Sequence, residues 1–71
     1  MITRDMLDNW FRFHTATHDQ PEKYEAIMAA ARAFADVVVA NTPPSADQTT
    51  AVRGIREVTW VACASIACGG A

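Results

Sequence analysis

Apolar side chains recur at intervals of three and four residues along most of the chain, which is the repeat of one face of an α-helix. Three separate segments carry this repeat, and it predicts helices over residues 4–14, 20–41 and 46–68. The fold class expected from the pattern is therefore all-α.

Residues that start or stop a helix mark the boundaries of these segments. Residues 15–18 form a connector, and the sequence DQPE at residues 19–22 is typical of a helix start, with an N-cap Asp, a first-turn Pro and an acid three residues on. Two prolines at 43 and 44 stop the second helix. The sequence SADQ at residues 45–48 matches a capping box, and the glycines at 69 and 70 end the third helix.

The connection between the second and third helices is short, which makes them antiparallel neighbours. Their main apolar ridges are Tyr24, Ile27, Met28, Ala31, Phe34, Ala35 and Val38 in the second helix and Val52, Ile55, Thr59, Ala62 and Ile66 in the third. Each helix carries a second stripe beside its ridge, rich in small residues, and two stripes imply two neighbours. Gly54 lies within the third helix and favours either a close helix approach or a bend there. We expect a short N-terminal helix and a long helical hairpin, assembled as a compact, obligate homo-oligomer.

Length and composition narrow the possible functions. The chain has 71 residues and a net charge of −2, so residues 1–71 form one small domain without a broad basic face for DNA or RNA. The uncharged run over residues 58–71 is shorter than the about 20 residues that span a membrane, and no signal peptide is evident. Cys63 and Cys68 lie five apart on one helix and cannot form a disulfide with each other. Free thiols agree with a cytoplasmic location.

The sequence gives little sign of catalysis. His14 and His18 are the only side chains that ordinarily titrate near neutral pH. Neither is spaced from a nucleophile or a second base in a way that is typical of a catalytic site. Cys63 and Cys68 are interpreted as small packing residues, because no basic residue lies near them in sequence to lower a thiol pKa. No zinc-binding spacing is present. We therefore expect neither an enzyme nor a cofactor.

Two groups of residues are candidates for binding. Arg53, Arg56 and Trp60 share one face of the third helix, a combination suited to an anionic aromatic ligand. The same pattern also fits solvated arginines and an indole buried against another protomer. The second group lies at the open end of the hairpin, where Lys23 and Tyr24 begin the second helix and face the end of the third.

The N-terminal helix joins the hairpin at this open end. Its aromatic residues, Trp10, Phe11 and Phe13, occupy more than one face, so at least one of them should meet a ligand or a partner chain. Core packing remains an alternative role for Tyr24.

Several segments together resemble a known family. These are DQPEKYEAI at residues 19–27, the alanines at 30 and 31, PPS at residues 43–45 and AxASIA at residues 62–67. In their order and spacing they are similar to the small phage anti-defence proteins that act as sponges for cyclic oligonucleotide signals. This is the anti-CBASS family, whose helical hairpin domain is shared with Thoeris anti-defence proteins. The resemblance runs from residue 10 to residue 67.

The resemblance implies a hexamer in the cytoplasm of an infected bacterium that binds cyclic dinucleotides between protomers, with separate pockets for cyclic trinucleotides in some relatives. It implies binding without cleavage, which keeps the CBASS effector silent. By position, Phe11 and Phe13 would stack on bases, Lys23 would contact phosphate, and Tyr24 matches an aromatic position of the family. Arg53 and Arg56 fall outside its motif and are candidates from the helix face alone.

Two residues depart from the family pattern. Met28 stands where many relatives have a basic residue, and Cys63 stands where an Asn is common. The first departure removes a possible phosphate contact, and the second removes the hydrogen bonds of an amide.

Other functions stay open from the sequence. The chain could instead be a phage structural or adaptor oligomer that binds a protein through the face from Arg53 to Trp60. The preferred bases and linkages are open as well, and so is the choice between a cyclic oligonucleotide and a cyclised ADP-ribose.

Overall fold

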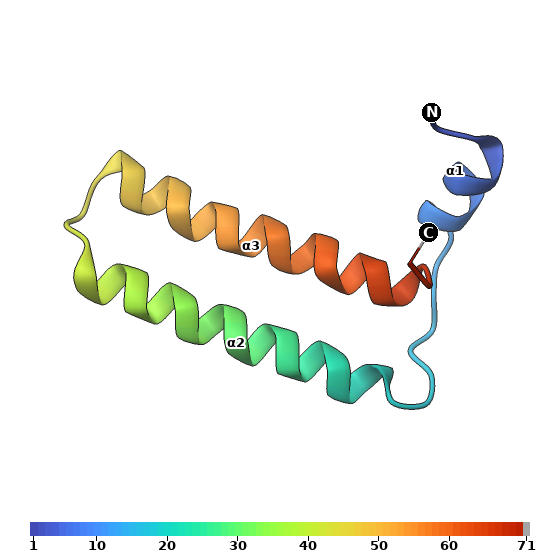
Figure 1. Ribbon diagram of the computed structural model, residues 1–71, viewed down its shortest axis with the longest axis horizontal. Coiled ribbons are helices and arrows are strands. Elements are labelled where there is room, and N and C mark those ends of the chain that lie inside the picture. Colours follow the sequence, from blue (N-terminus) through green and yellow to red (C-terminus); the bar gives the residue numbers. More distant parts are fainter. Residues whose placement is uncertain (71) are drawn as a thin grey trace.

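The computed structural model describes residues 1–70 and contains three helices, α1 (Arg4–Trp10), α2 (Gln20–Asn41) and α3 (Ala46–Ala67). Figure 1 shows α2 and α3 side by side and antiparallel, joined by a tight turn at one end. The short helix α1 lies beyond the other end, beside the end of α3, and a connector runs from it to the start of α2. No strand occurs within these residues. The all-α class and the helical hairpin are confirmed.

The predicted start of α3 is confirmed in atomic detail. The Ser45 hydroxyl accepts a hydrogen bond from the Gln48 backbone amide at 3.1 Å, which is the N-cap half of the predicted capping box. The Gln48 side chain then donates to the Thr42 carbonyl at 3.1 Å, and the Thr42 hydroxyl donates to the Val38 carbonyl at 2.7 Å. These bonds fix the turn that holds α2 and α3 together at this end.

The start of α2 lies at the predicted residue, but its cap differs from the prediction. Asp19 occupies the N-cap position without capping an amide through its side chain. Its carboxylate forms an ion pair with Lys23 at 3.1 Å instead. The Gln20 side chain organises the preceding turn by accepting a hydrogen bond from the Thr17 amide at 3.1 Å.

The first helix is shorter than the predicted 4–14, and that prediction is corrected. It ends at Trp10, and the ring Nε2–H of His14 donates to the Asn9 carbonyl over 2.7 Å. In a continuing helix this carbonyl would accept the amide of residue 13. The imidazole takes that place, so the chain leaves the helix and residues 11–19 run on as a connector.

The predicted glycines end α3, although the helix stops at Ala67, one residue before the predicted Cys68. Gly69 and Gly70 have φ values of +68° and +82°, which favour glycine. Their amides donate to the carbonyls of Ile66 and Ser65, at 3.2 and 2.8 Å. This is a Schellman motif, and it satisfies carbonyl groups at the end of the helix.

The hairpin has little interior. Thr59 is the only buried residue between positions 1 and 70, and no hydrophobic residue there is fully buried. Most residues of the two predicted ridges are half-buried where α2 meets α3, whereas Met28 and Phe34 remain exposed. No described helix is long and apolar enough to cross a membrane.

Candidate functional site

Arg56 and Trp60 form the best organised pair among the candidate residues. They stand four apart on α3, so their side chains lie on the same face of the helix. The Arg56 guanidinium carbon is 4.3 Å from the centroid of the Trp60 ring, a cation–π contact. Trp60 nevertheless remains 57% exposed, which leaves much of the indole accessible to a ligand.

This pair borders a groove of about 210 Å³ between α3 and α2. The groove is lined by Met28, Ala31, Arg32 and Ala35 from α2 and by Val52, Ile55, Arg56, Thr59 and Trp60 from α3. It therefore combines an apolar floor with two guanidinium groups and an indole. Arg53 is exposed on the same helix and does not line the groove.

The two arginines of the groove differ in how their charge is balanced. Arg32 forms an ion pair with Asp36 through its Nε, 3.1 Å from a carboxylate oxygen, and both side chains are largely exposed. Arg56 has no carboxylate within salt-bridge distance among the described residues. Its positive charge is thus the one best placed to meet an anionic ligand.

Lys23 and Tyr24 lie in the first turns of α2, as predicted. The Lys23 ammonium binds the Asp19 carboxylate, and this hydrogen bond with its charge lowers the pKa of the Asp19 carboxyl. Tyr24 is half-buried. The start of α2 is tied to the end of α3 by the Gln20 side chain, whose Nε2 donates to the Ile66 carbonyl at 3.5 Å. The predicted proximity of these two ends is confirmed.

Phe11 and Phe13 lie in the connector after α1 and are 83% and 88% exposed. Because α1 ends at Trp10, neither phenylalanine has a place on a helix face. Within residues 1–70, no hydrogen bond, ion pair or ring contact joins either of them to Lys23 or Tyr24.

The six predicted binding residues therefore do not form one pocket in a single chain. Phe11, Phe13, Lys23 and Tyr24 belong to the open end of the hairpin, and Arg53 and Arg56 lie further along α3. Arg32 also lines the groove, although it is not among the residues predicted from the sequence. Its signal was its position one turn after Met28, on the side of α2 that faces α3.

A further cluster joins α1 to the end of α3. The Asn9 side chain donates to the Cys68 carbonyl at 3.1 Å, and the Cys68 sulfur lies 3.8 Å from the His14 Nε2. Since that nitrogen donates its proton to the Asn9 carbonyl, it is not a base for the thiol. No group of three or more metal-ligating side chains occurs in the described part of the chain. This cluster positions α1.

Comparisons of the chain with models of protein families, with curated proteins and with solved structures found no match. The resemblance to cyclic-oligonucleotide sponges stays a prediction from the sequence.

Proposed function

We propose that the protein binds cyclic oligonucleotide second messengers, cyclic dinucleotides such as cyclic GMP-AMP and also cyclic trinucleotides, and sequesters them without cleavage. The observation that carries this proposal is the Arg56 guanidinium stacked on the exposed Trp60 indole at the edge of a groove. A cyclic dinucleotide presents planar bases and two phosphate charges. An indole and a guanidinium offer a stacking surface and a phosphate donor for such a ligand.

The residues at the open end of the hairpin also offer stacking surfaces and a positive charge for phosphate. Phe11 and Phe13 expose nearly their whole rings, and Lys23 carries a positive charge at the start of α2. A charge-assisted hydrogen bond contributes about 1.5–3 kcal/mol, and stacking contributes about 1–3 kcal/mol per base in single-stranded complexes. Two contacts of each kind are enough for tight binding.

Sequestration in this proposal belongs to a homo-oligomer, and a hexamer is what the family resemblance implies. Within one chain the two groups of candidate residues are separate, so a neighbouring copy is needed to bring both groups to one ligand. Across a two-fold axis a single lysine per chain can pair with both phosphates of a two-fold ligand. By binding the messenger, the oligomer would keep the CBASS effector inactive.

A thermal-shift panel of cyclic dinucleotides, cyclic trinucleotides and cyclic ADP-ribose isomers tests this function. A ligand that binds the folded oligomer raises its melting temperature as the ligand concentration exceeds Kd. We expect Lys23→Ala or Arg56→Ala to weaken binding of the preferred ligand by at least about tenfold, as loss of a charge-assisted contact predicts. Arg4→Ala is the control, because it removes the same charge from α1, outside both groups.

A second candidate function is that of an adaptor that binds a protein. The observation in its favour is the exposure of Val58, Trp60 and Val61, large apolar residues on α3. An adaptor would show no thermal shift with any nucleotide of the panel. If Lys23→Ala and Arg56→Ala leave nucleotide affinity unchanged, the proposed residues are wrong.

A further inference from the structure

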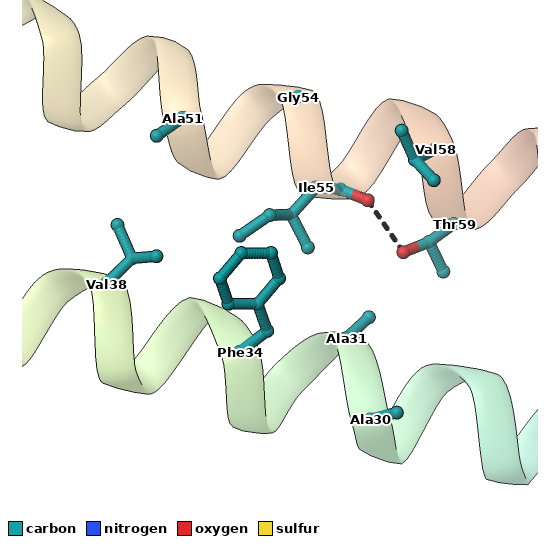
Figure 2. Close-up of a pocket in the computed structure, with 9 residues that line it drawn as sticks. All are labelled: Ala30, Ala31, Phe34, Val38, Ala51, Gly54, Ile55, Val58 and Thr59. Atoms are coloured by element: carbon teal, nitrogen blue, oxygen red, sulfur yellow. Dashed lines mark hydrogen bonds between the residues drawn. The ribbon is translucent and has the colours of Figure 1, made fainter.

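An apolar depression lies along the hairpin between α2 and α3. It has a volume of about 520 Å³ and, as Figure 2 shows, is lined from both helices. Its lining residues are Ala30, Ala31, Phe34, Val38, Ala51, Gly54, Ile55, Val58 and Thr59. We call this set the hairpin groove. None of its residues is charged.

The hairpin groove offers an occupant almost no polar group. Thr59 supplies its only hydroxyl, which already donates to the Ile55 carbonyl at 2.7 Å (Figure 2). Phe34 and Val58 expose large apolar side chains beside it. The surface therefore suits another apolar surface and would not hold the charged ligand proposed above.

The exposed area of the chain indicates how much surface an occupant must cover. The accessible area is 5761 Å², whereas a folded monomer of 7.7 kDa exposes about 4,300 Å². The excess of about 1,400 Å² is larger than the about 800 Å² that each partner buries in a standard protein interface. The excess is therefore large enough to supply one interface of standard size along the hairpin.

We propose that a second copy of this chain covers the hairpin groove, with α2 and α3 of both copies packed as a four-helix bundle. The groove is self-complementary, because Phe34 and Val58 project from it while Ala30, Ala51 and Gly54 leave room. A Cβ atom added at Gly54 would meet nothing within 4 Å, so the chain alone leaves this space empty. In a two-fold symmetric dimer, Phe34 and Val58 of each copy would enter the space beside Gly54 of the other copy. Both copies would then use the same surface, as an isologous interface requires.

The lack of a buried apolar core selects a second copy over another protein. No hydrophobic residue among the described ones is buried, and a neighbouring copy would supply the apolar burial that the single hairpin lacks. A second copy is made together with every chain and is always present. The inference rests on the homo-oligomer of the proposed function and not on its ligand.

Matched charge substitutions test the surface in the full-length chain. Val58 is 69% exposed in one chain and lines the groove, whereas Val39 is 53% exposed and does not. Glutamate at either position would stay solvated in an isolated chain. We expect Val58→Glu to raise the dissociation constant in sedimentation equilibrium by about 100-fold or more, because a covered groove would bury an unpaired charge. Val39→Glu should leave it within about threefold of the wild type.

Photo-crosslinking gives a second measurement that does not depend on a destabilised variant. Benzoylphenylalanine replaces Phe34 in one sample and Val39 in another, each mixed with isotope-labelled chains so that links between copies are recognised by mass. We expect position 34 to link to α2 or α3 of another copy, and position 39 to give no such link. A monomeric wild type would overturn both the oligomer and this surface. An oligomer that keeps its affinity with Val58→Glu, or lacks the position 34 link, would overturn the surface alone.

Discussion

Lys23 illustrates how a single contact controls a candidate binding residue. Its ammonium is held 3.1 Å from the Asp19 carboxylate, and this contact lowers the pKa of Asp19. A depressed carboxyl pKa means that the ion pair is present above the pKa of the unfolded chain and is lost as the pH falls through the folded value. Near neutral pH, a phosphate must therefore compete with Asp19 for Lys23.

Removing this competitor should strengthen binding. We predict that Asp19→Asn raises the affinity for the preferred cyclic nucleotide by about two- to fivefold, the range expected for an exposed ion pair. Isothermal titration calorimetry at pH 7 measures the change. Glu25→Gln is the matched control, because it removes one negative charge from the same helix without touching Lys23. An equal gain in affinity in both variants would mean that net charge causes the effect. No gain in affinity with Asp19→Asn would mean that Lys23 does not contact the phosphate.

The spacing of the candidate residues predicted which of them share a helix face only where the helix was predicted correctly. Arg56 and Trp60 share a face because of their spacing, and the structure places them in contact. Phe11 and Phe13 were expected on a helix and lie in a connector, because the His14 ring bonds to a backbone carbonyl. The His14 side chain bonds back to the preceding helix, and such a contact produces no periodic pattern in the sequence.

At the scale of elements, residues that start or stop helices predicted where the two long helices lie. Proline at 43 and 44, serine at 45 and glycine at 69 and 70 each impose a backbone conformation or a cap, and their effect is independent of tertiary packing. The sequence predicted the end of α1 at residue 14, four residues after the observed end at Trp10. The observed end depends on contacts of His14 with Asn9 and with the distant Cys68. Contacts between distant residues do not show in a single sequence.

Gly54 provides a prediction at the level of the helix. In an isolated helix, Ala is more favourable than Gly by about 0.5–1 kcal/mol, and the chain alone has open space for the added methyl. If a second copy packs closely against α3, Gly54→Ala should instead lower the midpoint of thermal unfolding. Calorimetry at one fixed protein concentration decides the sign. A raised midpoint would mean that the groove beside Gly54 is open or loosely packed.

The whole molecule has more apolar surface than one hairpin can bury. The apolar share of the sequence is 51%, yet the single chain leaves large residues such as Phe34, Val58 and Trp60 exposed. The two stripes on each long helix predicted this need for neighbours. They could not specify which face meets which copy, because helical periodicity gives the direction of a side chain and not its partner.

A single measurement tests whether the assembled protein sequesters a messenger. A cyclic oligonucleotide is held at a fixed concentration while the protein is increased, the free ligand is separated by filtration, and the bound fraction is recovered after heating. Mass spectrometry then identifies both fractions. We predict that free ligand falls in proportion to added protein and that all of it returns intact. Ligand that stays free at every protein concentration, or returns as cleaved product, would contradict the account.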